Sequence, residues 1–392
     1  MYQSKLLKIF MSVLGQAEFG TIYLLHKRKV IFSSQGKMPG PLAMIYINDQ
    51  TCIKNFFLKG DIGWAESYIR NLWTTDNLSN FLQWGALNFR FFSDYIRGKW
   101  YITFYLRLRH YLNSNSKNGS RKNITYHYDL GNEFYGRWLD ESMTYSSAIF
   151  KDKNQKLFLA QKNKFSKLAN LCSVKENEKI LEIGCGWGAF SIFLAKTKKA
   201  NVTAITISKK QFDIVRKKVF EEGLTQKVNV KLLDYRDISG KYDKIFSIEM
   251  FEAVGEKYWP IYFDKIKSHL VKNGKFGLQT ITIDNNYFES YRKFPDFIQT
   301  YIFPGGMLAS QEILDKTLRK TGLKIYKKFL FGDHYAKTLN AWKNSFENSW
   351  EEIKKLGFDT SFKRLWEYYF SYCEGGFKSG NINVGQFLIG RE

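Results

Sequence analysis

The chain has 392 residues, of which 44% are hydrophobic and 25% charged, and this balance excludes an intrinsically disordered protein. Its 60 Lys and Arg against 37 Asp and Glu give a formal net charge of +23, which suits nucleic acid, an anionic membrane surface or an acidic small molecule as partner. No apolar run approaches the ~18–20 residues of a membrane-spanning helix, and we expect no signal peptide because polar residues interrupt the first apolar patches.

The positive charge has two explanations. Lys, Asn, Ile and Phe are all abundant, as in proteins from AT-rich genomes. Codon usage therefore explains the positive charge as well as an anionic partner does. Zinc-finger, RRM and basic-zipper signatures are absent from the sequence, which favours anionic lipid over nucleic acid as the partner. The cysteines form no C-x-x-C pair, so we expect no metal site, no disulfide framework and a reducing, cytoplasmic location.

The first 112 residues are expected to form an N-terminal unit. Apolar alternation predicts a pair of strands within 29–49, and helical patterns follow at 64–73 and 77–96. Residues 113–123 (NSNSKNGSRKN) are rich in Asn, Ser and Gly and carry basic but no acidic residues. They predict a basic surface linker, which is either a contact for lipid headgroups or a solvated loop.

From residue 124, strand-like and helical segments alternate. Short apolar runs predict strands at 179–184, 201–208, 228–234, 242–250 and 275–283. Amphipathic runs predict helices at 189–197, 210–223 and 258–274. This alternation predicts an α/β domain with a doubly wound, mostly parallel sheet, to which residues 285–392 add aromatic-rich helical segments.

A glycine-rich turn follows the first of these strands. Gly184, Gly186 and Gly188 stand at alternate positions between the strand and a helix, where glycines allow a tight turn and a helix N-terminus offers free N–H groups. The spacing also satisfies the dinucleotide fingerprint, but the segment 203–211 lacks the acidic residue that a dinucleotide site places there. Glu182 ahead of the glycines instead favours S-adenosylmethionine, with Asp234 placed to accept from its adenine.

The fourth strand ends in SIEMFEAVG (247–255). Ligands bind beyond the carboxyl ends of parallel strands, so Glu252 is expected to point into the crevice. Glu249 is expected to lie within the strand as a satisfied or partner-facing acid. Segments 127–135 and 143–150 precede the sheet and are candidates for a cover over the cofactor.

Several segments together resemble the cyclopropane-fatty-acyl-phospholipid synthase family, which includes the mycolic acid methyltransferases. They are HYDLGNEFYGRWLDESMTYSSAIF (127–150), LEIGCGWGAFSIFLA (181–195), VTAITISKKQ (202–211), DYRD (234–237), IEMFEAVG (248–255), FIQTYIFPGG (297–306) and HYAKTLNAW (334–342). The resemblance implies a Rossmann-like class I methyltransferase domain over 124–392 and a smaller N-terminal α+β domain over 1–112 that handles lipid.

The same resemblance implies roles for individual residues. Tyr145 and Ser146, beside Gly184, Gly186 and Gly188, would contact the methionine part of S-adenosylmethionine. Thr206 and Gln211 would hold its ribose, and Asp234 with Tyr235 its adenine. The family reaction is attack of a cis alkene of a lipid chain on the sulfonium methyl group, followed by proton loss and ring closure.

In the family, a bound bicarbonate removes that proton, and the resemblance places its site at Ser147, Glu252, Gln279, Ile281 and Tyr335. Here Ser147 replaces a cysteine and Gln279 a histidine, so the bicarbonate site is altered. The Ser147 hydroxyl and the Gln279 amide could still donate hydrogen bonds to an oxyanion, but an imidazolium charge is lost. Without an effective base, the cation would lose a neighbouring proton and leave a C-methylated chain without a ring.

The expected activity is therefore S-adenosylmethionine-dependent one-carbon transfer to an unsaturated phospholipid acyl chain. Alternatives are C-methylation without ring closure, a small-molecule methyltransferase, a catalytically inactive lipid-binding protein and, least favoured, an NAD oxidoreductase. The resemblance and the charge together predict a cytoplasmic protein at the inner face of the membrane, held by anionic lipid. The family also allows a homodimer.

Overall fold

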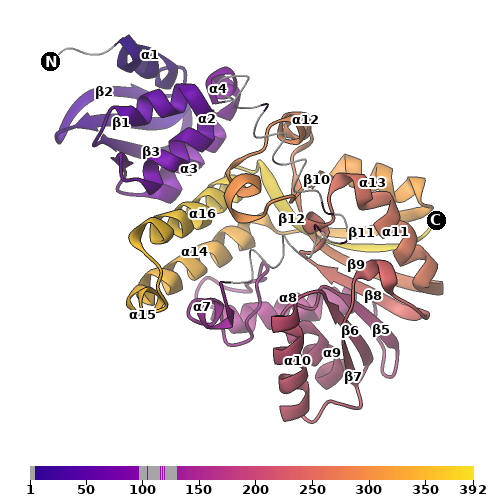
Figure 1. Cartoon of the computed structure of the whole chain (residues 1–392). Helices are drawn as coiled ribbons and strands as arrows, with labels where there is room; N and C mark the ends of the chain where they lie inside the picture. The colour runs from indigo at the N-terminus through magenta and orange to yellow at the C-terminus, as the bar shows by residue number, and fades with distance from the viewer. Residues whose placement is uncertain (1–4, 97–103, 105–114, 116, 118, 120–129) are drawn as a thin grey trace. The chain divides into compact units, whose positions relative to one another are not determined.

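The computed structural model describes residues 5–96, 104, 115, 117, 119 and 130–392. The chain forms two compact units, each made of three chain segments (Figure 1). The first unit comprises residues 1–112, 289–304 and 342–382, and the second comprises 113–288, 305–341 and 383–392. The functional residues expected from the sequence all belong to the second unit.

The first unit contains a four-stranded sheet in the order β2-β1-β3-β4. The strands are β1 (Phe19–His26), β2 (Lys29–Gln35), β3 (Met38–Ile47) and β4 (Trp73–Thr74). The helical elements are α1 (Lys5–Leu14), α2 (Thr51–Ile69), α3 (Leu78–Leu87), α4 (Phe89–Ile96), η4 (Ile298–Ile302), α15 (Trp350–Lys354) and α16 (Thr360–Lys378). The rings of Trp64 and Trp73 stack at 4.6 Å and Phe81 packs edge-on to Trp73, so large aromatic side chains build this core.

The two strands expected within 29–49 both form, as β2 and β3, but they do not pair with each other. β1 lies between them, antiparallel to β2 and parallel to β3. The connection from β2 to β3 passes so close to the start of β1 that a Cβ on Gly36 would lie 2.3 Å from the Glu18 backbone, and one on Gly20 would lie 2.4 Å from the Pro41 carbonyl oxygen. The expected pairing is wrong because glycines let the backbone cross an intervening strand.

The second unit contains an eight-stranded sheet in the order β11-β12-β9-β8-β5-β6-β7, with β10 beside β9. The strands are β5 (Lys179–Ile183), β6 (Asn201–Thr206), β7 (Val228–Leu232), β8 (Tyr242–Ile248), β9 (Leu270–Ile283), β10 (Ala309–Ser310), β11 (Leu323–Leu330) and β12 (Ile382–Arg391). β5 is parallel to β6 and β8, and β8 is parallel to β9, as the alternation of elements predicts. This is the α/β class I methyltransferase sheet, and with the small α+β sheet of the first unit it confirms the expected fold class.

Helices cover this sheet, and their apolar faces share one core with it. The helices are α7 (Asn132–Gly136), α8 (Leu157–Leu171), α9 (Ala189–Lys198), α10 (Lys209–Glu221), α11 (Trp259–His269), α12 (Asn285–Lys293), α13 (Gln311–Lys320) and α14 (Gly332–Asn348), of which α12 and α14 continue past the unit's boundaries. Phe165 of α8, Phe190 of α9 and Val215 of α10 pack in one cluster with strand residues. Each such side chain contributes roughly 1.5–3 kcal/mol on burial, which fixes the strand ends that carry the site.

The C-terminal region differs from the expectation of helices alone. β11 and β12 extend the sheet antiparallel to each other, and β12 lies between β11 and β9. In addition, residues 270–274, expected to end a helix, begin β9. The strand pattern is weak because β11 carries three lysines, two of them in its exposed stretch at the sheet edge, and Gly385 and Gly390 interrupt the apolar run of β12.

The expected linker at 113–123 lies largely outside the described residues. Of its described members, Lys117 forms an ion pair with Asp237 at 2.6 Å and Asn115 donates to the Gly305 carbonyl at 2.6 Å. Within the described ranges, no helix is both long and apolar enough to cross a membrane. The same ranges contain no group of three or more His, Cys, Asp or Glu side chains suited to a metal ion.

Candidate active site

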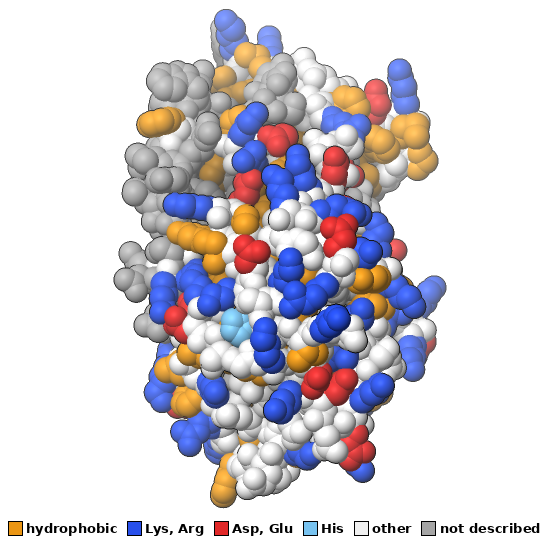
Figure 2. Space-filling view, turned by 90° about the vertical axis from the view of Figure 1, so that its right-hand side faces the viewer, with side chains coloured by type: hydrophobic (Ala, Val, Ile, Leu, Met, Phe, Trp, Pro, Cys, Tyr) orange, Lys and Arg blue, Asp and Glu red, His pale blue; other side chains and the backbone are white. Residues whose placement is uncertain are grey.

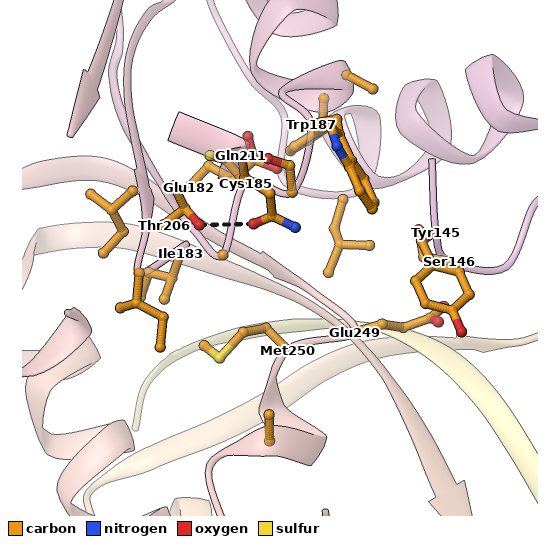
Figure 3. A pocket seen from close by; sticks show the side chains of 18 of the residues that line it. Tyr145, Ser146, Glu182, Ile183, Cys185, Trp187, Thr206, Gln211, Glu249 and Met250 are labelled. Atoms are coloured by element: carbon orange, nitrogen blue, oxygen red, sulfur yellow. Dashed lines mark hydrogen bonds between the residues drawn. The ribbon is translucent and has the colours of Figure 1, made fainter. Parts of the chain in front are cut away.

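A pocket opens at the carboxyl ends of β5, β6 and β8 in the second unit (Figure 3). The volume open to the centre of a water molecule is about 140 Å³. The expected cofactor residues that line it are Tyr145, Ser146, Gly184, Gly186, Thr206, Gln211, Asp234 and Tyr235. Because these residues come from five segments, the parallel sheet brings them together as the switch-point rule for α/β folds predicts.

The three glycines of the turn have different surroundings. Gly184 and Gly186 line the pocket with φ of 78° and 53°, and a Cβ on Gly186 would meet no atom within 4 Å. Gly188 does not line the pocket: at φ 84° its Cβ would lie 2.7 Å from Cγ1 of Val215. Gly188 therefore allows the start of α9 to pack against α10, whereas Gly186 leaves space beside the pocket.

Polar groups are fixed at two strand ends. The hydroxyl of Thr206, the last residue of β6, donates to Oε1 of Gln211 at 2.8 Å, the dashed contact in Figure 3. Asp234, two residues after β7, is 2% exposed and accepts from the backbone N–H and the guanidinium of Arg236 at 2.9 and 3.3 Å. These contacts hold one amide and one carboxylate in place against the pocket.

Aromatic rings form a wall, of which the sequence singled out only Tyr145. Trp187 lines the pocket, donates from Nε1 to Asn132 at 2.9 Å and packs on Tyr135 at 5.2 Å between ring centroids. Tyr145 packs on both Tyr135 and Trp138. Residues 132–138 therefore cover one side of the pocket, as expected for the segment preceding the sheet, while residues 127–129 lie outside the described ranges.

A buried lysine stands behind the pocket. Lys164 of α8 is 0% exposed and donates from Nζ to the Ser146 hydroxyl at 2.6 Å. Burial lowers the pKa of Lys164 to about 7, although Glu249, Asp140 and Glu182 favour its charged form. Burial also raises the pKa of Glu182 to about 8, and its carboxylate accepts from Ser191. Lys164 had no sequence signal, because a lysine in an amphipathic helix is ordinarily exposed.

Glu249 lies in the site and not within the strand, which corrects the expectation. β8 ends at Ile248, and Glu249 follows it with φ of 48°, a left-handed conformation that L-residues seldom adopt. Its carboxylate accepts from the backbone N–H of Ser147 at 2.9 Å, from Nε2 of Gln279 at 2.8 Å and from the Tyr335 hydroxyl at 2.6 Å. Figure 3 shows this side chain extending from the strand end toward Tyr145 and Ser146.

Glu252 has a different environment. Its Oε1 accepts from the backbone N–H of Ile281 at 2.6 Å and from the Thr280 hydroxyl at 2.9 Å. Its Oε2 is buried and has no hydrogen-bond partner among the described residues. Burial, and then the negative charge of Glu249, raise the pKa of Glu252 to about 8, so this carboxyl group is largely protonated at neutral pH.

The residues expected to hold an anion thus divide into two groups. Ser147, Gln279 and Tyr335 converge on Glu249, whereas Ile281 contacts Glu252. The Ser147 hydroxyl donates to the Ala148 carbonyl at 3.2 Å, so the backbone N–H of Ser147, and not its side chain, serves the site. The amide of Gln279 does donate to an anion, and that anion is the chain's own carboxylate.

Comparison with known proteins adds to this geometry. Residues 115–387 match the family model described as mycolic acid cyclopropane synthetase. The chain is 39% identical over 285 residues to the tuberculostearic acid methyltransferase UfaA1 of Mycobacterium tuberculosis, covering 71% of this chain and 66% of that protein. It is 31% identical over 356 residues to the cyclopropane-fatty-acyl-phospholipid synthase of Escherichia coli, covering 89% and 88%.

Among solved structures, the mycolic acid cyclopropane synthase CmaA1 complexed with SAH and CTAB has a TM-score of 0.64 and 27% identity. The similarity covers 69% of this chain and 97% of that one. The aligned part of this chain therefore corresponds to nearly the full length of that protein.

Proposed function

Because the chain belongs to the mycolic acid cyclopropane synthetase family of S-adenosylmethionine-dependent methyltransferases that act on fatty acyl chains, we propose that it methylates the double bond of an unsaturated phospholipid acyl chain. The observation that carries the proposal is the pocket, in which the glycine turn and Asp234 lie together with Glu249. When bound, S-adenosylmethionine supplies an electrophilic methyl group on a sulfonium. The remaining chemistry falls to the protein's own side chains.

The pocket residues fit that cofactor in kind. Asp234 offers a buried carboxylate to an amino group, and Thr206 with Gln211 offers a hydroxyl and an amide to the ribose. Gly184 and Gly186 allow close approach of the backbone, and Tyr145, Ser146 and Tyr235 complete the lining. We assign Gly188 a packing role, since it does not face the pocket.

Bicarbonate fits the site less well. The donors of Ser147, Gln279 and Tyr335 are already directed at the Glu249 carboxylate. Bicarbonate therefore has no part in the proposed mechanism. The role of Glu252 is to remain a neutral acid beside Glu249, because its pKa is raised and its buried Oε2 accepts no hydrogen bond from the residues that the structure describes.

C-methylation without ring closure is the second candidate. It is favoured by the Ser147 hydroxyl, which is directed away from the site, and by the identity of 39% to a methyltransferase against 31% to a cyclopropane synthase. Both candidates share the first step, in which a methyl group adds to the alkene. They differ in which proton the lipid cation then loses.

The test is mass spectrometry of membrane lipids from cells that express the chain and are fed methyl-deuterated methionine, with cells lacking the chain as control. Acyl chains that gain one carbon with three deuteriums would show methylation without loss from the new methyl group. Retention of two deuteriums means loss from the methyl group, and mild hydrogenation then separates an exocyclic methylene, which takes up hydrogen, from a ring, which does not. Acyl chains without any deuterium would refute the proposed function.

The first unit and the surface complete the proposal. Residues 1–112 would act as an accessory lipid-handling domain, 113–123 as a basic linker and 124–392 as the catalytic domain. The chain would work in the cytoplasm at the inner face of the membrane, held by anionic lipid, and would form a homodimer as its family allows. The net charge of +23 supports the lipid contact.

A further inference from the structure

We propose that Glu249 is the proton acceptor of the reaction, a built-in base that makes the enzyme independent of any small anion from solution. This inference rests on the proposed function, because it concerns the proton that the methylated acyl chain must lose. Glu249 lines the same pocket as Asp234 and the glycine turn, so its carboxylate belongs to the cavity where methyl transfer would occur.

Three donors from three separate segments fix this carboxylate. The backbone N–H of Ser147 comes from the loop before α8, the Gln279 amide from β9 and the Tyr335 hydroxyl from α14. Gln279 itself is oriented, because its Oε1 accepts from Nε2 of Gln386 at 3.0 Å and its Nε2 therefore faces Glu249. A set of donors so directed is what an oxyanion site requires, and here a side chain of the protein fills it.

The backbone is unfavourable at this residue. Glu249 has φ of 48°, where a residue with a Cβ is strained and glycine is not. Strained backbone persists where the surrounding structure holds it, and such residues concentrate at functional sites. The left-handed turn carries the carboxylate out of the strand direction and into the pocket.

The electrostatic surroundings of Glu249 favour a stronger base than an ordinary carboxylate. Burial raises the pKa of Glu249, while Lys164 and the hydrogen bonds from Tyr335, Gln279 and Ser147 oppose that shift. A carboxylate with a raised pKa is a stronger base than one in water, and the three donors hold its oxygens in place to accept a proton. The neighbouring Glu252 retains its proton, so the two carboxyl groups divide into one acceptor and one neutral acid.

The step balances without a further reactant. After the methyl group has joined one alkene carbon, the other carries a positive charge. A C–H bond of the new methyl group, or of a carbon next to the charge, then breaks. Its electron pair forms the closing C–C bond or a C=C bond, and the proton passes to a Glu249 oxygen. The resulting neutral carboxylic acid returns the proton to water once product has left.

Two substitutions at this position test the proposal, with deuterium incorporation into acyl chains as the measure. Glu249→Gln keeps the size of the side chain and removes the base, and should slow product formation roughly 10²–10⁴-fold. Glu249→Gly relieves the left-handed strain and opens the donor set, so added bicarbonate or formate should restore a substantial part of its activity. Glu222→Gln, at an exposed residue directly after α10, is the control for loss of one charge and should keep the native rate.

Binding provides a readout that does not depend on turnover. The ¹³C signal of labelled bicarbonate should broaden with the Glu249→Gly protein and stay sharp with the native protein. Native activity that needs added bicarbonate, or a Glu249→Gln protein that is folded by circular dichroism and as fast as native, would overturn the inference. Either result leaves the proposed function standing, which fails only if the native chain transfers no label.

Discussion

Glu252 is a residue near the site whose protonation changes on folding. In the unfolded chain its pKa is the ordinary 4.5, and in the folded chain burial beside Glu249 raises it to about 8. Between these pH values the folded protein keeps a proton that the unfolded chain has lost. The free energy of unfolding therefore falls as the pH rises from about 4.5 to about 8.

Replacing this carboxyl group should remove that pH dependence. Between pH 5 and pH 8, we expect the free energy of unfolding to fall by roughly 2–4 kcal/mol less in Glu252→Gln than in the native protein. The size follows from the pKa shift, because each pKa unit corresponds to about 1.4 kcal/mol. Urea denaturation at both pH values measures the difference. Glu182, whose pKa is also raised, contributes in the same direction in both proteins and cancels in the comparison. Parallel curves for the two proteins would contradict the assignment.

The site was predictable from the sequence only where residues follow strand ends. Thr206 and Asp234 stand after apolar runs in a parallel sheet, so their place at one edge follows from the topology. Lys164 and Trp187 were not predictable, because the sequence patterns around them are explained as well by core packing as by a binding site. The sequence analysis placed Glu249 within the strand because it directly continues the strand pattern of residues 242–248. Its left-handed backbone, which the sequence pattern does not reveal, turns its side chain into the pocket.

At the scale of elements, the parallel core was predictable and the edges were not. β5, β6 and β8 are largely buried and mostly apolar, and such runs identify strands that helices cover, whereas β7 alternates apolar and polar residues at the sheet edge. β11, with its exposed lysines, lacks that signal, and so does β12, which glycines interrupt. The position of β1 between β2 and β3 depends on backbone contact at glycines, which no periodicity encodes.

The packing of α9 on α10 should depend on Gly188. A methyl group there would overlap Val215 Cγ1 at 2.7 Å and strain a backbone at φ 84°. We expect Gly188→Ala to lower the free energy of unfolding by roughly 2–4 kcal/mol while folded protein still binds S-adenosylmethionine. Thermal denaturation and isothermal titration calorimetry measure the two effects. Val215→Ala combined with Gly188→Ala should recover part of the loss, and no recovery would place the strain elsewhere.

At the scale of the whole molecule, the basic side chains on the face drawn in Figure 2 are not gathered in a single patch. Figure 2 shows Lys and Arg side chains over the whole visible face, with acidic and hydrophobic side chains among them. α1 combines both features that a membrane contact needs, since Leu6 and Ile9 are 42% and 38% exposed and Lys5 and Lys8 are exposed beside them. A helix of this kind lies well in a lipid interface.

We therefore expect the protein to bind vesicles that contain anionic lipid and to bind neutral vesicles much less, since each well-placed Lys or Arg contributes about 1 kcal/mol. Flotation with liposomes measures this binding. Leu6→Glu with Ile9→Glu should weaken it several-fold, whereas Ile261→Glu, an equally exposed change on α11, should not. Equal binding to neutral and anionic vesicles would rule out an electrostatic contact.

The placement of β12 has a consequence for biosynthesis. This strand is made after both β9 and β11, yet it lies between them, and its Gln386 orients the Gln279 amide that faces Glu249. A nascent chain on the ribosome can form β5 to β9 early. The edge of β9 that faces away from β8 cannot pair with β12 until residues 382–391 emerge. Chaperones that shield strand edges would thus act until β12 has emerged, and a nascent chain that still lacks β12 would not yet methylate lipid.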